Sequence, residues 1–194
     1  MMPAPAAAPV PAVVPAVAPA AAASPAAALA TTLAQAPAQA AFQRQVLTPF
    51  KLRLFMLQKL PMAWLAGLRL VALAPGAATV TVPFKYLTQN PFRSIYFACL
   101  AMAAELASGM LAMLHTQGGG PVSMLVVGLE AEFSKKAVGL ISFRCEDGAA
   151  IAQAVAASRA SGPGRTVVAT STGTDAAGDV VAVFRITWSF RAKA

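Results

Sequence analysis

Alternating apolar and polar residues mark several segments of the chain as β-strands. The clearest lies at residues 179–191, where every second side chain from Val180 to Phe190 is apolar and the residues between them become polar from Arg185 onward. A period of two is typical of a strand with one buried face. Shorter alternating or valine-rich runs bounded by turn residues predict further strands. Their ranges are 68–73, 79–84, 123–133, 138–145 and 165–172.

Three other segments have the spacing or composition of helices. Residues 94–115 are a long run rich in Ala, Leu and Met, which are good helix formers, and a helix of this length would be about 33 Å long. Residues 48–59 place apolar side chains in helical register, and residues 149–160 are alanine-rich. Because the strands cluster around one long helix rather than alternating with helices, we expect an α+β fold in which a curved antiparallel sheet wraps that helix.

Glu105 is the single acid in the long helix and lies near its middle. On a helical wheel its neighbours are nearly all small, whereas the bulkier Leu100, Met110 and Leu114 lie on the opposite side, which we interpret as the core face. The small neighbours would let another backbone or a ligand approach the carboxylate. An unpaired carboxylate in apolar surroundings is costly to keep ionised. Glu105 is therefore paired with a buried cation, protonated, or poised for chemistry.

Charge is distributed unevenly along the chain. Residues 1–43 contain no charged residue and eight of the fifteen prolines, which predicts a disordered Ala/Pro-rich tail with, at most, a short helix within residues 26–41. Residues 44–194 have the size of one domain. The formal net charge of +8 comes from scattered cations, so we expect no nucleic-acid partner. A helix with an acid at mid-span is also a poor membrane span.

The few histidines and cysteines predict neither a metal site nor a disulfide framework. The chain has one His and two Cys, with no ligand spacing among them. Cys99 and Cys145 are expected to be small core residues of a reducing compartment. The tail lacks the basic start of a secretory signal. Together these features indicate a cytoplasmic protein.

The run NPFRSIYFACLAMAAELASG resembles the helix entry of the hotdog-fold thioesterases. Those proteins carry N-x-x-G-x-x-H-G-G, with Asp or Glu nine residues after the His. Here Asn90, Tyr96 and Glu105 stand at the Asn, His and acidic positions, Arg93 replaces the first Gly, and Phe97–Ala98 replace the Gly pair. The chain is similar to a thioesterase-like branch that is catalogued as a domain of unknown function. The resemblance extends to the TDAAGDVVA turn and the last strand.

This resemblance implies a hotdog fold over residues 44–194 and hydrolysis of acyl thioesters, commonly of coenzyme A, with no metal or redox cofactor. Glu105 would act as general base or nucleophile. Asn90 would position the attacking water, and Tyr96 would donate a hydrogen bond in place of the His. A backbone NH of Phe97 or Ala98 would polarise the thioester carbonyl.

The resemblance also implies substrate and partner contacts. Arg93, Ser94, Phe97, Ala98 and Met102 are expected to bind substrate. Within this group Met102 would line the acyl chain and Arg93 would meet coenzyme A phosphates, a role that also suits the adjacent lysines at 135–136. Hotdog proteins pair as dimers with sites between subunits, so a homodimer or higher homo-oligomer is expected.

Other interpretations of the same residues stay open. Asn90 before a proline also suits a turn, and Tyr96 and Phe97 also suit a core or an interface. Because the His and the glycines are replaced, the alternative function is a non-catalytic hotdog protein that binds an acyl or lipid ligand or a protein partner. A further alternative is a peripheral membrane protein that uses the basic and apolar helix at residues 48–59.

Overall fold

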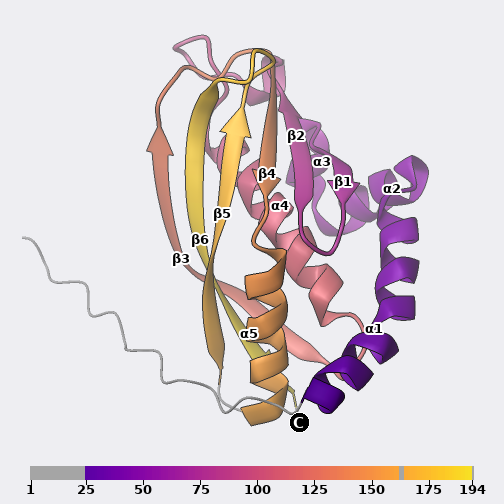
Figure 1. The fold of residues 1–194 in the computed structure, drawn as a ribbon. Helices are drawn as coiled ribbons and strands as arrows, with labels where there is room; N and C mark the ends of the chain where they lie inside the picture. Colours follow the sequence, from indigo (N-terminus) through magenta and orange to yellow (C-terminus); the bar gives the residue numbers. More distant parts are fainter. Residues whose placement is uncertain (1–24, 162–163, 194) are drawn as a thin grey trace, which may run out of the picture.

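A computed structural model, which describes residues 25–161 and 164–193, places one long helix against a six-stranded antiparallel sheet (Figure 1). The strand order is β1-β2-β4-β5-β6-β3. The long helix, α4 (Phe97–Thr116), packs against β1, β2, β4, β5 and β6, so the sheet curves around it. This arrangement confirms the predicted α+β fold with a central helix wrapped by a single sheet.

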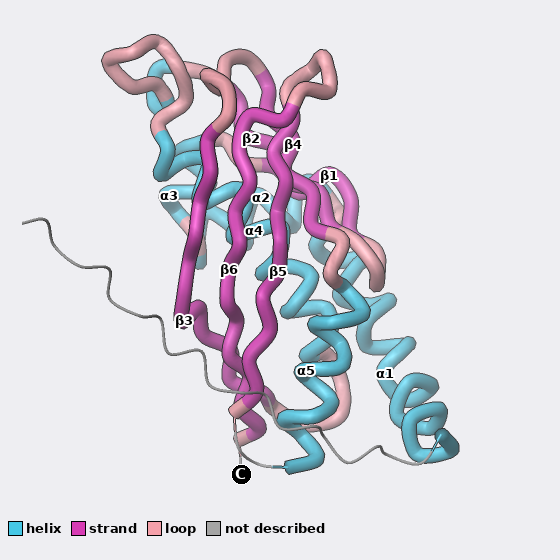
Figure 2. Tube along the Cα trace, turned by 60° about the vertical axis from the view of Figure 1, so that its left-hand side comes forward, coloured by secondary structure: helices cyan, strands magenta, loops and turns pink. Residues whose placement is uncertain are grey.

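The elements have the following bounds in chain order. The strands are β1 (Arg69–Leu73), β2 (Ala78–Pro83), β3 (Val122–Phe133), β4 (Leu140–Cys145), β5 (Arg165–Thr174) and β6 (Val180–Ala192). The helices besides α4 are α1 (Pro25–Val46), α2 (Pro49–Lys59), α3 (Pro61–Ala66) and α5 (Gly148–Ser161), with a short 3-10 helix η1 (Tyr86–Thr88). Figure 1 shows α1, α2 and α3 on the same side as β1, and Figures 1 and 2 both show β3 at the other edge of the sheet.

All six predicted strands are present, and the differences from prediction lie in the helices. The long helix begins at Phe97 rather than at residue 94, because Tyr96 has an extended backbone (φ −61°, ψ 133°) and acts as the N-cap. Helix α3 was not expected. It forms because Pro61 suits the first turn of a helix and Gly67 ends it in the left-handed conformation, with φ 78°.

The amino-terminal prediction falls partly outside the structure. Residues 1–24 lie outside the described residues, whereas α1 includes the alanine-rich segment for which a short helix was considered. Phe42 packs against the core, and Gln43 donates a hydrogen bond from Nε2 to the carbonyl oxygen of Leu73, at 2.9 Å. The end of α1 is therefore attached to the sheet, and the division at residue 44 stays a prediction.

The core fills the space between α4 and the sheet. Leu100, Met110 and Leu114 are buried, as the helical wheel predicts, and they meet the inward face of β6, including Phe184 and Phe190. Among the described residues, α4 is the one helix long and apolar enough to cross a membrane, with a mean hydropathy of 1.8 over a window that is 67% buried. Its burial under five strands identifies it as the core helix of this fold.

Two side-chain hydrogen bonds fix α4 against the sheet. Trp188 of β6 donates from Nε1 to Ser108 Oγ at 3.0 Å, and Ser108 in turn donates to the carbonyl oxygen of Glu105 at 3.1 Å. Ser171 of β5 donates to the carbonyl oxygen of Ala104 at 2.8 Å. These bonds hold the middle of α4 in one rotational setting and so determine which way Glu105 faces.

We predict that the Trp188 to Ser108 bond contributes to stability. Trp188→Phe should lower the free energy of unfolding by about 1 kcal/mol, and Ser108→Ala should lower it by about 1–3 kcal/mol because it leaves the buried indole NH without an acceptor. The double variant should lose less than the sum of the single losses. Urea denaturation of the four proteins measures this, and strictly additive losses would contradict a direct bond.

Candidate functional site

The loop that leads into α4 is organised by Asn90. Its Oδ1 accepts hydrogen bonds from the backbone NH of Phe92 at 3.0 Å and of Ser94 at 3.2 Å, and its Nδ2 donates to Ser94 Oγ at 3.1 Å. Its own backbone NH donates to the carbonyl oxygen of Ser94 at 2.9 Å. Both ends of the Asn90 amide are thus used within residues 90–95. The contacts give this residue a structural part in setting the entry to α4, and its role in catalysis stays a prediction.

Arg93 has a left-handed backbone, with φ 58°. This conformation costs a residue with a side chain roughly 1–2 kcal/mol, whereas glycine adopts it freely. The position is the one at which the hotdog thioesterase pattern has glycine. Arg93 therefore has a backbone conformation that a glycine at this position would adopt without strain. The Arg93 side chain is exposed, outside the nearby cavity.

The start of α4 opens into a cavity of about 570 Å³. Tyr96 and Phe97 line it, are 46% and 56% exposed, and contact each other edge to face with ring centroids 4.9 Å apart. The backbone NH groups of Phe97 and Ala98 have no acceptor among the described residues, as is usual for the first turn of a helix. These free donors lie at the positive end of the helix dipole, where they can bind an oxyanion.

Glu105 lies on a half-buried stripe of α4 that also contains Ala98 and Met102. Its Oε1 is next to Gly109: a Cβ added there would come within 3.1 Å of Oε1 and 3.3 Å of the Trp188 ring. Within residues 25–161 and 164–193, the Glu105 carboxylate has no ion pair or hydrogen bond. Burial raises the pKa of this carboxyl above its usual value. The buried pair with Arg or Lys that the sequence left open is thus not found.

The structure brings some of the predicted residues together and separates others. Asn90, Ser94, Tyr96 and Phe97 line the cavity at the start of α4. Ala98, Met102 and Glu105 instead share the half-buried stripe of the helix, and Glu105 lines neither this cavity nor a larger one near α2. From Phe97 to Glu105 the helix rises about 12 Å. One chain alone therefore does not place the acid beside the free NH groups.

Residues from a distant loop complete the cavity. Phe133 at the end of β3 and Lys136 after it lie across from Tyr96, although nothing in their local sequence indicates this contact. Of the lysine pair expected near phosphates, Lys135 is held by Asp175 at 2.6 Å and Asp179 at 2.7 Å, which raises its pKa. Lys136 has no such partner among the described residues and is the free cation at this cavity.

We predict that Glu105→Gln stabilises the protein at alkaline pH. A carboxyl whose pKa is raised by folding weakens the folded state when it is ionised, and this effect fades as the pH falls through its folded pKa. The variant should be more stable than the wild type by about 1 kcal/mol at pH 8, with a smaller difference at pH 5. Denaturant unfolding at both pH values measures this. A variant less stable than the wild type at pH 8 would mean that the carboxylate has a favourable partner.

Solved structures share this architecture at low sequence identity. A probable thioesterase of unknown function from Pseudomonas aeruginosa is 23% identical, with a TM-score of 0.62 over 75% of this chain and 97% of that one. A thioesterase family protein from Silicibacter pomeroyi is 20% identical, with a TM-score of 0.54 over 73% and 96%. A thioesterase from Haemophilus influenzae is 12% identical, with a TM-score of 0.53 over 75% and 91%. These similarities establish the hotdog fold.

Sequence comparison identifies the family. None of the curated proteins compared with this sequence matches it. A family described as Domain of unknown function (DUF4442) matches residues 51–190. This match covers β1 to β5, all but the last two residues of β6, the whole of α4 and the loop that Asn90 organises. The chain therefore belongs to the DUF4442 family and has the hotdog fold of the thioesterase-like proteins.

Proposed function

We propose that the protein hydrolyses acyl thioesters, such as acyl-CoA, with Glu105 as general base. The observation that carries this proposal is the state of Glu105. Its carboxylate is half-buried on the half-buried stripe of α4, its pKa is raised, and it has no protein partner among the described residues. A buried acid kept without a partner is costly. Such groups are common at catalytic sites. The similarity in fold to proteins named thioesterases supports the same class of reaction.

The chemistry needs one base and one oxyanion site. Glu105 removes a proton from water as the water oxygen attacks the thioester carbonyl carbon, and a base with a raised pKa suits this step near neutral pH. The carbonyl oxygen becomes an oxyanion, which the backbone NH groups of Phe97 and Ala98 stabilise. The tetrahedral intermediate then collapses, the carbon–sulfur bond breaks, and the leaving thiolate takes the proton from Glu105. The products are a carboxylic acid and a free thiol.

The distance along α4 requires a second subunit. Reacting groups must approach to about 3–3.5 Å, whereas Glu105 and the first turn are about 12 Å apart along the helix. The carboxylate also lies beside Gly109, on the side away from that first turn. A partner molecule related by a twofold axis, with its α4 running in the opposite direction, would bring its own Phe97 and Ala98 NH groups to Glu105.

Strand β3 offers the surface for this pairing. It is an edge strand of 12 residues, and long unpaired edges tend to pair with another strand. Leu129 and Phe133 lie opposite the buried Ile186 and Ala182 of β6, so they are on the inner face of the sheet, yet both are 51% exposed. A second copy added along β3 would cover these side chains and the half-buried stripe of α4.

The surrounding residues suit an acyl thioester. Met102 and Met113 are half-buried on α4, and Leu106 is buried beside them, which favours an apolar acyl chain. Arg93 and Lys136 are exposed cations near the entrance, suitable for the phosphates of coenzyme A. Asn90 and Ser94 would act by holding the loop, and Tyr96 would donate its hydroxyl hydrogen to the substrate.

We predict that the purified protein releases free thiol from at least one member of an acyl-CoA panel of increasing chain length. Glu105→Gln should lower kcat by about 100-fold or more, which is the usual effect of losing a general base. Glu146→Gln is a matched control, because Glu146 is an exposed carboxylate paired with Arg144 and remote from α4 in the chain. It should keep wild-type turnover.

The same assay separates the alternative. A wild type that turns over no thioester but whose melting temperature rises with acyl-CoA would be a non-catalytic acyl-binding protein, an outcome consistent with the absence of the His and Gly pair at 96–98. Equal turnover by wild type and Glu105→Gln would contradict the role of this acid.

We predict that Val127→Lys weakens a dimer that Val71→Lys leaves intact. The two valines are both 54% exposed and both lie at register shifts, one in edge strand β3 and the other in edge strand β1. A lysine opposes strand pairing at an edge. Analytical ultracentrifugation should show a dimer for wild type and Val71→Lys, and at least about tenfold weaker association for Val127→Lys. A monomeric wild type would contradict the shared site.

A further inference from the structure

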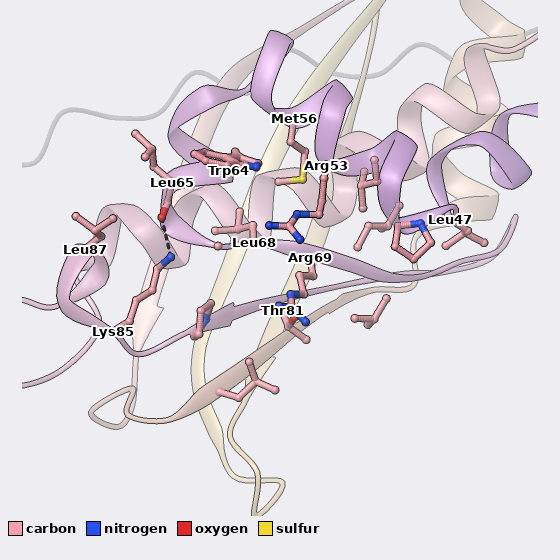
Figure 3. A pocket seen from close by; sticks show the side chains of 17 residues that line it. Leu47, Arg53, Met56, Trp64, Leu65, Leu68, Arg69, Thr81, Lys85 and Leu87 are labelled. Atoms are coloured by element: carbon pink, nitrogen blue, oxygen red, sulfur yellow. Dashed lines mark hydrogen bonds between the residues drawn. The ribbon is translucent and has the colours of Figure 1, made fainter.

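A cavity of about 1120 Å³ lies at the β1 end of the sheet, between α2, α3, β1 and β2 (Figure 3). We refer to it as the α2–β1 groove. It shares no lining residue with the cavity at the start of α4, and none of the residues proposed for thioester hydrolysis lines it. Its volume is slightly above the range of about 300–1,000 Å³ that is usual for small-molecule sites, so a long ligand would fit. The groove is therefore a second site, whose use does not depend on that reaction.

The lining of the groove is mainly apolar. Leu52 and Met56 from α2, with Leu68 and Leu70 from the segment after α3, are buried around it, and Trp64 and Leu65 of α3 are more exposed at its side. Figure 3 shows the Met56 and Trp64 side chains on the α2–α3 side of the groove. A continuous aliphatic and aromatic lining suits a hydrocarbon chain rather than a sugar or a nucleotide.

All charged residues that line the groove are cations: Arg53, Arg69 and Lys85. Lys85 donates to the carbonyl oxygen of Leu65 at 2.7 Å. Arg53 and Arg69 have no ion pair or hydrogen bond among the described residues, and in Figure 3 the Arg53 guanidinium points from α2 toward the strand that carries Arg69. Residues 1–104 contain no Asp or Glu. No acid of this half of the chain can therefore neutralise them.

A buried hydroxyl lies beside these arginines. Thr81 of β2 stands opposite Arg69 of β1 in the strand pairing. It lines the groove, is 7% exposed, and its hydroxyl has no hydrogen-bond partner among the described residues. Arg53, Arg69 and Thr81 all line the groove and supply donors to it. Arg69 and Thr81 lie on the same face of the sheet, the one opposite to the buried pair Leu70 and Val80. A carboxylate accepts such donors at both oxygens, and arginine binds it in a two-pronged manner.

We propose that the α2–β1 groove binds a long-chain fatty-acid anion, with the carboxylate at Arg53, Arg69 and Thr81 and the hydrocarbon chain along the apolar lining. The amphiphile matches both halves of the groove: the chain needs the apolar walls, and the head group complements cations that have no acid nearby. An added peptide strand fits less well. β1 has only five residues, and its pairing shifts register at Val71, which makes this edge a poor template for another strand.

The two tryptophans of the chain report on the two sites separately. Trp64 lines the groove, whereas Trp188 is 3% exposed in the core beside Glu105. Bromine on a lipid chain quenches a nearby tryptophan. Titration of the full chain with dibromostearate should quench part of the emission of the wild type in a saturable way. In Trp64→Phe that part should be lost. Quenching that persists in Trp64→Phe would report binding near Trp188, at the proposed hydrolytic site.

The arginines are tested with a matched control on the same helix. Arg53→Gln with Arg69→Gln should raise the Kd for dibromostearate at least about tenfold, because it removes charge-assisted hydrogen bonds. Lys51→Gln, on α2 but outside the groove, should leave the Kd unchanged. All three side chains are exposed, so these variants should fold, as circular dichroism would verify. Competition by hexadecanoate but not by hexadecanol would establish that the charge is required.

Several outcomes would overturn this proposal. One is the absence of saturable quenching through Trp64, and another is an unchanged Kd in the double arginine variant. A third is binding only to phosphatidylglycerol vesicles, lost equally with Lys51→Gln and Lys59→Gln, which would show a membrane-surface helix instead. A fourth is Arg53- and Arg69-dependent self-association in ultracentrifugation, which would show that a second copy covers the groove. Thioester turnover is measured independently, so either proposal can fail alone.

Discussion

The burial of α4 under the curved sheet is the constraint on which the rest of the structure depends. Five strands pack on this helix, and its buried side chains are apolar except for those of Ser108 and His115. The Trp188 to Ser108 bond and the Ser171 to Ala104 bond then fix its rotation. Once that rotation is fixed, Glu105 has to face the part of the helix that the sheet leaves half open. The unusual environment of this acid is a consequence of how the helix is held.

The same constraint explains why the site is open on one side. β3 continues the sheet beyond β6, but it is not among the strands that pack closely on α4. Inner-face residues of β3, such as Leu129 and Phe133, therefore remain half exposed. An acid without a partner, a helix start with free NH groups and an unpaired edge strand are three separate features of the described residues. A second subunit would complete each of them together.

The sequence predicts those features whose cause is local or periodic. Alternation identifies the strands, as in β6, and the length and composition of α4 identify the core helix with its one acid. Features that depend on tertiary contacts are not predictable in this way. The sequence leaves a turn role for Asn90 open, but the particular hydrogen bonds that its Oδ1 accepts from the NH groups of Phe92 and Ser94 become visible only with the loop path. Phe133 and Tyr96 are far apart in the sequence, and only the tertiary structure brings them to the same cavity. Helix α3 has only six residues, which is too short for a helical period to show in the sequence.

The uneven charge along the chain gives the two open regions opposite electrostatic character. All the acids lie in residues 105–194, so the apolar stripe of α4 contains a carboxylate, whereas the α2–β1 groove contains only cations. The thioester group itself is neutral and can approach Glu105 without repulsion, but the carboxylate of the fatty acid formed by its hydrolysis would be repelled by an ionised Glu105. The same anion fits the charge of the groove. If both proposals hold, the molecule has one site that disfavours the product and another that favours it, and the distribution of acids along the sequence is the physical origin of that difference.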